Sequence, residues 1–228
     1  MKNIFYIVVA GYLISSCSGL PIQTKAEAYP AMYDDRKPLS VLVIPAINNS
    51  TAAEATDFFN VTITEPLSNV GYYTMPVEIV KDIFQQEGIV DSTMIKGLPT
   101  SIFKKNFGAD AVLFVTINKW DKQYIVIAGN VSVSMDYVML STETSEVIWS
   151  YSATQTIDTT AESSGFIMLD IISTAITTAT TDYVPIAKQV NYQAFTALPH
   201  GGYSDLHGLD QEQSISTIMK DAALEEDL

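Results

Sequence analysis

Two short, continuous apolar runs constrain the fold of this chain more than any other feature. They cover residues 39–45 (LSVLVIP) and 111–118 (AVLFVTIN), and both are rich in β-branched side chains. Runs of this length and composition are typical of central strands buried within a sheet. Buried strands need covering layers, so we expect an α/β protein with helices packed on one or both faces of a sheet.

The segment between the two runs predicts most of these helices. Residues 52–69 carry apolar side chains at spacings of three and four, and Gly71 is expected to end this helix in a left-handed conformation. A brief strand is predicted at 72–75 and a second amphipathic helix at 77–84. One or two further helical turns are expected within 92–106.

The second half of the chain predicts an antiparallel meander. Apolar residues alternate with mostly polar ones from Val131 to Met139, which is the period of a strand with one buried face. Residues 141–145 (STETS) predict a turn, and 147–151 begin a returning strand. The expected architecture is therefore a mixed sheet that ends in an antiparallel meander.

Two later segments predict further helices. Residues 163–182 contain a strongly apolar stretch at 166–176, for which a transmembrane hairpin or pore helix is one interpretation. Asp170 and the following threonines favour a core helix or a subunit-facing helix, so 166–176 is the predicted self-association face. A short helix is expected at 184–198.

The first seventeen residues predict membrane anchoring. Lys2 precedes an apolar run at 4–14, followed by Ser15, Ser16 and the chain's one cysteine, Cys17. The apolar run is shorter than the roughly 20 residues that a membrane span requires, and is typical of a secretory signal. The sequence LISSC resembles a bacterial lipobox, in which the cysteine is acylated, for instance with palmitate. An ordinary signal peptide with a coincidental cysteine is the alternative.

These features predict a division of the chain into four parts. They are a signal peptide at 1–16, an acylated N-terminus and linker at 17–37, one α/β domain at 38–198, and an acidic, flexible tail at 199–228. Ser18, rather than aspartate, follows the cysteine, and in such lipoproteins this favours sorting to the outer membrane. We therefore expect a lipid-anchored protein on the periplasmic or surface face of that membrane.

Composition excludes several functions. Twelve Lys and Arg residues against 26 Asp and Glu residues give a net charge of −14, which repels nucleic-acid phosphates. A single cysteine excludes an intramolecular disulfide framework, and two histidines leave little for a metal centre. No cofactor is expected.

Few residues are candidates for a site. Asn48, Asn49 and Ser50 follow the first buried run, where ligands commonly bind in open α/β sheets, although helix capping is the favoured explanation of these residues. Asp110 lies in a helix-to-strand turn and lacks a nearby partner base, so we assign it to backbone hydrogen bonding.

The remaining polar residues predict neither a metal site nor an enzyme. His200, Asp205 and His207 match no metal-ligand spacing and lie in the glycine-bearing tail. No Gly-x-Ser-x-Gly elbow is present, and Cys17 is assigned to lipid, so no catalytic residue is predicted.

Four segments together resemble one known family. They are SVLVIPAINNS at 40–50, VTITEPLSNVGYYTMPVEIVKDIFQQEG at 61–88, FGADAVLFVTINKW at 107–120 and SEVIWSYS at 145–152. The resemblance covers about residues 38–185 and is to bacterial outer-membrane lipoproteins of unknown function, whose known member is a meningococcal surface-antigen candidate. Family members tend to carry Thr-Gly where this chain has Thr144 and Ser145.

This resemblance implies a fold like the amino-terminal domain of TolB. It also implies distant kinship to curli-channel-type lipoproteins and to a ring-forming lipoprotein of an exopolysaccharide export system. A curli-channel-like lipoprotein is the partner that the resemblance suggests, because the genes of the two are often neighbours.

The expected function is that of an accessory or assembly factor for an envelope or export system, acting through protein–protein contacts as a homo-oligomer. The alternative is a module that binds a small molecule, glycan or peptidoglycan fragment, with Trp120, Tyr124 and Trp149 lining a concave face. A hydrolase with two convergent carboxylates is a third interpretation.

Overall fold

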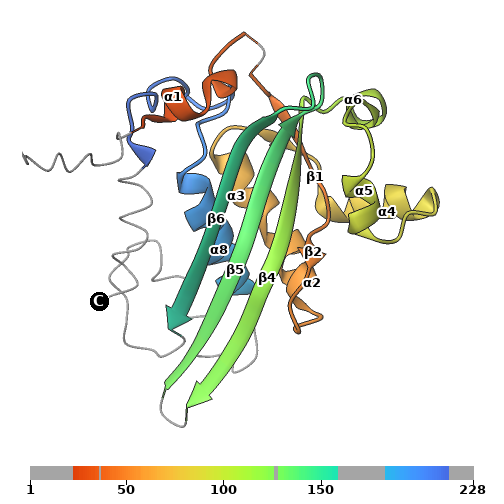
Figure 1. Ribbon diagram of the computed structural model, residues 1–228, viewed down its shortest axis with the longest axis vertical. Coiled ribbons are helices and arrows are strands. Elements are labelled where there is room, and N and C mark those ends of the chain that lie inside the picture. The colour runs from red at the N-terminus through yellow and green to blue at the C-terminus, as the bar shows by residue number, and fades with distance from the viewer. Residues whose placement is uncertain (1–22, 36, 126–127, 159–182, 216–228) are drawn as a thin grey trace, which may run out of the picture.

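The computed structural model describes residues 23–35, 37–125, 128–158 and 183–215. Its centre is a six-stranded mixed sheet with the strand order β3-β1-β4-β5-β6, while β2 pairs separately with β4 (Figure 1). The strands are β1 (Ser40–Val43), β2 (Ile47–Asn48), β3 (Tyr73–Thr74), β4 (Ala111–Ile125), β5 (Ala128–Ser141) and β6 (Val147–Asp158). β1 runs parallel to β3 and β4, and β4, β5 and β6 form the predicted antiparallel meander.

Helices cover both faces of the upper part of this sheet. They are α1 (Lys25–Ala28), the 3-10 helix η1 (Pro30–Met32), α2 (Ala55–Thr62), α3 (Thr64–Asn69), α4 (Val77–Gln86), α5 (Ser92–Lys96), α6 (Ser101–Phe107) and α8 (Val184–Thr196). The α/β class and the mixed sheet are thus confirmed.

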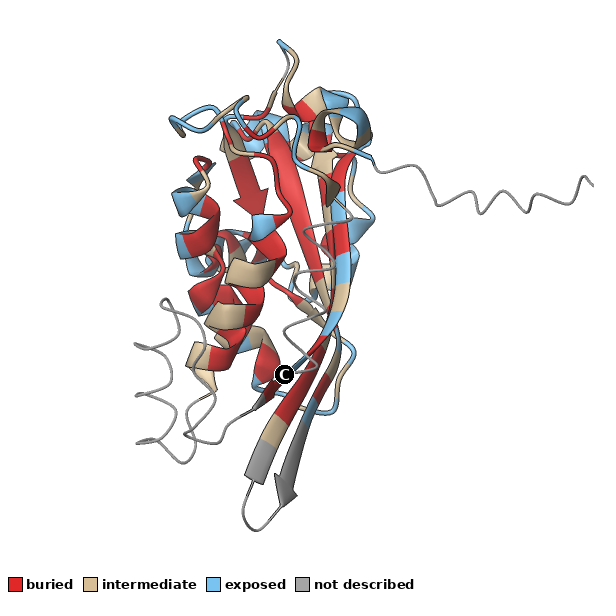
Figure 2. Cartoon of the chain, turned by 90° about the vertical axis from the view of Figure 1, so that its left-hand side faces the viewer, coloured by how far each residue is buried: buried red, intermediate tan, exposed pale blue. Residues whose placement is uncertain are grey.

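Alternating residues of β1 enter two separate cores. Val41 and Val43 join the larger one with α2, α3 and α8, whereas Leu42 packs on the other face with α4, α5 and α6. This burial on both faces is what the apolar run at 39–45 predicts. Figure 2 shows the buried residues along the inner surfaces of the sheet and helices.

The helix predicted at 52–69 is divided into α2 and α3. Pro66 explains the break, because it has no N–H to donate to the carbonyl of Thr62 and its ring crowds that carbonyl. Gly71 adopts φ +93° after α3, in the left-handed position that the sequence predicts.

The folded body extends beyond the boundaries predicted at 37 and 199. Thr24 forms an antiparallel bridge with Ser214, and the Lys25 ammonium lies 3.3 Å from Asp210 Oδ2 in a buried ion pair. Residues 23–35 and 199–215 therefore pack together and against the body. The sequence favoured a linker and a solvated tail instead, because the two partners are 185 residues apart and each segment alone is short and polar.

Gly201, in the segment 199–215, allows this segment to pack closely against Gly71. The Gly201 amide donates to the Val70 carbonyl at 2.8 Å, and a Cβ on Gly201 would collide with the backbone of Gly71. A Cβ on Gly71 would in turn approach Ser204 to 2.6 Å. Only glycines allow the two backbones to come this close.

Several predictions concern residues outside the described part of the chain. They are the signal peptide, acylation of Cys17, the apolar helix at 163–182 and the last residues of the tail. Among the helices that are described, none has the length and apolar character needed to cross a bilayer.

Candidate functional site

Asn48, Asn49 and Ser50 form a turn at the end of β2. Asn48 Oδ1 accepts hydrogen bonds from the Ser50 amide (2.9 Å) and hydroxyl (2.7 Å), while Asn48 Nδ2 donates to the Ala52 carbonyl at 2.7 Å. The Asn49 amide donates to the Ile117 carbonyl of β4 at 2.8 Å. The three residues do not cap α2, which begins at Ala55, because the chain makes further turns before it. Ligand binding at this turn stays a prediction.

Asp110 joins the beginnings of β1 and β4. Its Oδ2 accepts hydrogen bonds from the Leu39 amide (3.1 Å), the Ser40 amide (3.0 Å) and the Ser40 hydroxyl (2.9 Å). Its Oδ1 lies 2.5 Å from the Lys104 ammonium. Burial opposes ionisation of Asp110, but the hydrogen bonds from Lys104, Ser40 and Leu39 outweigh it and lower the pKa of this carboxyl. The carboxylate therefore holds two strands together, across 70 residues of sequence.

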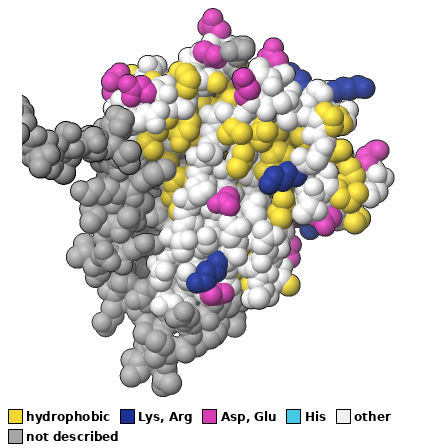
Figure 3. Space-filling view, viewed as in Figure 1, with side chains coloured by type: hydrophobic (Ala, Val, Ile, Leu, Met, Phe, Trp, Pro, Cys, Tyr) yellow, Lys and Arg dark blue, Asp and Glu magenta, His cyan; other side chains and the backbone are white. Residues whose placement is uncertain are grey.

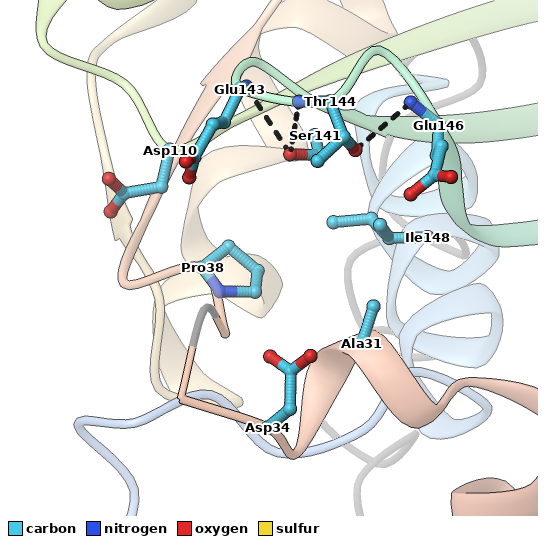
Figure 4. Close-up of a pocket in the computed structure, with 9 residues that line it drawn as sticks. All are labelled: Ala31, Asp34, Pro38, Asp110, Ser141, Glu143, Thr144, Glu146 and Ile148. Atoms are coloured by element: carbon cyan, nitrogen blue, oxygen red, sulfur yellow. Dashed lines mark hydrogen bonds between the residues drawn. The ribbon is translucent and has the colours of Figure 1, made fainter.

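An open pocket lies beside Asp110, between the N-terminal segment and the β5–β6 turn (Figure 4). It encloses about 350 Å³, solvent at its mouth included, and is lined by Ala31, Asp34, Pro38, Asp110, Ser141, Glu143, Thr144, Glu146 and Ile148. Figure 4 shows the carboxylates of Asp34, Asp110, Glu143 and Glu146 around the pocket. Four carboxylates make the pocket unfavourable for anions.

His200 and His207 are occupied within the C-terminal segment. The Nδ1 atom of His207 lies 2.5 Å from the His200 carbonyl oxygen, and His200 Nδ1 lies 3.4 Å from Ser204 Oγ. Burial lowers the pKa of His200, which favours its neutral form. No group of three or more potential metal ligands occurs in the part of the chain that the structure describes.

The two tryptophans do not line a binding surface. Trp120 and Trp149 are each 1% exposed. Trp120 packs edge-on against Phe59 with ring centroids 5.8 Å apart, and Trp149 stacks on Tyr151 at 6.3 Å. The prediction that these rings form a glycan platform is wrong, because both fill the core between sheet and helices. The side chain of Tyr124 lies outside the described residues.

The lower half of the outer sheet face is a flat, polar surface, which we call the hydroxyl face. Strand pairing aligns its residues in three rows across β4, β5 and β6: Thr116, Asp136 and Ser152; Lys119, Ser134 and Thr154; Asp121, Ser132 and Thr156, of which Ser132 alone is buried. Among the described elements, no helix lies over it, and Figure 3 shows mostly uncharged polar atoms there.

Several residues of the hydroxyl face bond to one another or to their neighbours on the strands, as Asp136 does to Asn118 Nδ2 at 2.7 Å. Thr154 donates to Ser134 Oγ at 3.0 Å, and Lys119 pairs with Asp121 at 3.3 Å. The signal for this surface was present in the sequence, since Ser132, Ser134 and Asp136 alternate with buried apolar residues. Alternation alone does not show whether a helix covers the polar side, so the surface was not identified as a site.

Comparison with known proteins gives concordant results. The family model described as "Putative lipoprotein GNA1162-like" matches residues 28–203. The protein "Putative lipoprotein NMB1124/NMB1162" of Neisseria meningitidis serogroup B is 24% identical over 205 residues, which cover 89% of this chain and 94% of that protein.

A solved structure shows a similar fold. The crystal structure of lipoprotein GNA1162 from Neisseria meningitidis is similar with a TM-score of 0.51 and 26% identity, covering 62% of this chain and 96% of that one. A weaker likeness, with a TM-score of 0.45 and 13% identity, is to the PelC dodecamer from Paraburkholderia phytofirmans, covering 72% of this chain and 89% of that one. Because the family model spans most of the sequence, this chain belongs to the family of GNA1162-like putative lipoproteins.

Proposed function

We propose that this protein is an outer-membrane lipoprotein, anchored through acyl chains on Cys17, that acts through protein–protein contacts as an accessory or assembly factor for an envelope or export system. Membership in a lipoprotein family supports the anchor, as does the LISSC sequence after a short apolar run. Several acyl chains bind a bilayer durably, at about 0.8 kcal/mol per buried methylene group.

The hydroxyl face is the observation that carries the proposed mode of action. Sites for small molecules are concave and mostly apolar, whereas this surface is flat and polar. Serine and threonine side chains are short, so they lose little conformational entropy when a partner orders them. Each hydroxyl can both donate and accept a hydrogen bond, which suits contact with another protein surface.

We propose a second copy of this chain as one partner of the hydroxyl face. Acylation confines all copies to one membrane, which raises their effective concentration and makes a weak contact sufficient. A curli-channel-like lipoprotein is a further candidate, suggested by the family resemblance alone.

Anchoring is tested by cell fractionation of a Cys17→Ala variant. The variant lacks the acylated thiol, so it should leave the outer-membrane fraction. Ser18→Ala, a change at the neighbouring residue, is the matched control and should stay in that fraction. Retention of Cys17→Ala in the outer membrane would disprove the anchor.

Contact through the hydroxyl face is tested by light scattering on the acylated chain in detergent and by cross-linking in membranes. Thr154→Lys places a long charged side chain at the middle row, and Thr93→Lys on α5, another exposed position, is the control. We expect Thr154→Lys to reduce the oligomer mass or the cross-linked product while Thr93→Lys leaves both unchanged. Equal behaviour of the wild type and both variants would contradict this role.

A further inference from the structure

The chain leaves little distance between the proposed anchor and the folded body. Five residues lie between Cys17 and Gln23, the first described residue, so six Cα–Cα steps join the two. A fully extended chain spans at most about 3.6 Å per residue, so Gln23 lies within about 22 Å of the Cys17 Cα atom. This is about half the length of the 14-residue strand β5, at roughly 3.3 Å per residue.

We call residues 17–22 the tether. The point where the tether joins the body is held by several hydrogen bonds. The Gln23 carbonyl accepts from the Ile215 amide at 3.0 Å, and the Lys25 amide donates to the Gln213 carbonyl at 2.9 Å. The Lys25 ammonium donates to the carbonyls of Thr196 and Leu198, each at 3.2 Å, besides pairing with Asp210. The segment around Asp210 therefore has a fixed position beside the tether.

That segment exposes large apolar side chains. Tyr203, Leu206 and Leu209 are 68%, 52% and 75% exposed. The Tyr203 amide donates to the Gly71 carbonyl, which brings this segment beside exposed Tyr73, and a Cβ on Gly202 would meet the Leu39 side chain at 2.5 Å. Together these five apolar residues form what we call the tether-end patch: Leu39, Tyr73, Tyr203, Leu206 and Leu209.

We propose that the tether-end patch inserts into the interfacial region of the bilayer that holds the acyl chains of Cys17. This inference rests on the proposed acylation, because the tether length is what keeps the patch at the membrane. Tyrosine and leucine suit the boundary between headgroups and acyl chains, where apolar faces insert about 5–10 Å deep.

The charges around the patch select the kind of lipid. Asp205 and Glu212 belong to the same segment, and Asp34 lies on the neighbouring N-terminal segment. Lys37 lies beside Leu39 and Gly202, but the carboxylates outnumber this one cation. They disfavour an anionic surface, so the patch is suited to zwitterionic phospholipid.

This contact also orients the whole body. In Figure 1 α1 lies at one end of the long axis, and the β4–β5 hairpin ends at the other. With the patch on the bilayer, the hairpin and the lower sheet face project away from the membrane. The hydroxyl face is then presented to partners rather than to lipid.

A fluorescence experiment tests the proposal on the full processed chain in phosphatidylcholine vesicles. Acylation leaves no free thiol at Cys17, so Leu206→Cys can be labelled alone with an environment-sensitive fluorophore. Met94→Cys on α5 is the matched control, because Met94 is 56% exposed and α5 lies across the molecule from α1 in Figure 1. The vesicles carry nitroxide-labelled lipid, which quenches only fluorophores in contact with the bilayer.

We expect the fluorophore at position 206 to lose most of its emission and to shift to shorter wavelength, while that at 94 keeps both. A chain that is recovered on the vesicles but unquenched at 206 overturns the inference and leaves the proposed anchor intact. A label at 206 that is shielded from aqueous iodide but not quenched by nitroxide lipid shows a second copy on the patch, which also overturns it. A chain that carries no lipid and stays off the vesicles overturns the anchor and the inference together.

Discussion

At the scale of single residues, the buried ion pair between Lys25 and Asp210 determines how the two ends of the described body are joined. Their side chains are 1% and 2% exposed, and burial lowers the pKa of Lys25 although Asp210 opposes that shift. Removing both ions from water costs several kcal/mol, and their attraction and the carbonyl contacts of Lys25 offset that cost. Loss of one partner therefore matters more than loss of both.

We predict that Asp210→Ala lowers the free energy of unfolding by about 3–5 kcal/mol, because it leaves the Lys25 charge buried without a counterion. The double variant Lys25→Met with Asp210→Asn should recover a large part of this loss, since it removes both charges and nearly keeps the volume of each side chain. Urea unfolding at neutral pH measures both values. If the double variant is less stable than Asp210→Ala, the account of an uncompensated charge is wrong.

Asp110 gives a second prediction, on pH dependence. Asp110→Ala should cost about 1–3 kcal/mol at neutral pH, because several hydrogen bonds to an ionised group are lost. The folded-state pKa is lowered, so this contribution is present above the unfolded pKa of about 3.9 and disappears as the pH falls through the folded value. Unfolding curves of wild type and variant should therefore converge below pH 4, and a difference that stays constant to pH 2 would contradict the role of the charge.

At the scale of elements, the sequence predicted the strands that have a local signature and missed those that depend on partners. β1 and the start of β4 followed from their apolar runs, and β5 from its period of two. The second half of β4 was missed, because a register shift between Ile117 and Lys119 interrupts the alternation. β2 has two residues and exists only through its pairing with β4, so no local pattern could predict it.

The turn between β5 and β6 provides a prediction at this scale. Ser145 has φ +64°, a conformation that costs a residue with a Cβ about 1–2 kcal/mol. Ser145 Oγ also lies 2.6 Å from Thr100 Oγ1, which lies 3.3 Å from the Thr142 carbonyl as an alternative partner. Ser145→Gly and Ser145→Ala both remove this hydrogen bond. The difference in stability between the two variants therefore measures the cost of the positive φ alone.

We expect Ser145→Gly to be at least as stable as the wild type and more stable than Ser145→Ala by about 1 kcal/mol. Thermal unfolding of the three proteins at one pH measures the order. Equal stability of the glycine and alanine variants would show that the turn relaxes to a negative φ in solution.

At the scale of the whole molecule, the sequence predicted the class of fold but not its limits. The hydrophobic pattern identified a mixed sheet with covering helices, because each element carries its own period. The joining of 23–35 to 199–215 depends on the Lys25–Asp210 ion pair and on backbone hydrogen bonds between the two segments. Two facing glycines, Gly71 and Gly201, hold 199–215 against the rest of the body, and all these contacts join residues far apart in sequence. The acidic, glycine-containing composition of the second segment is the same whether it is solvated or packed, which is why it suggested a tail. The hydroxyl face and the tether-end patch could not be identified from the sequence for a similar reason, because each is defined by which side chains the folded body leaves exposed.

The packed position of residues 199–215 leads to the last prediction, which concerns truncation. A chain that ends at Leu198 lacks Asp210, the backbone bonds from Gly201 and Tyr203, and the Pro199 carbonyl to which the buried Tyr72 hydroxyl donates at 2.7 Å. We expect it to unfold at a markedly lower temperature than the full chain, or to fail to unfold cooperatively, because a buried lysine and a buried tyrosine hydroxyl are left without these partners. A chain that ends at Ile215 is the matched control, since it keeps every one of these contacts. If the two truncated chains unfold at the same temperature, residues 199–215 act as the solvated tail that their composition suggested, and the Lys25–Asp210 pair does not stabilise the body.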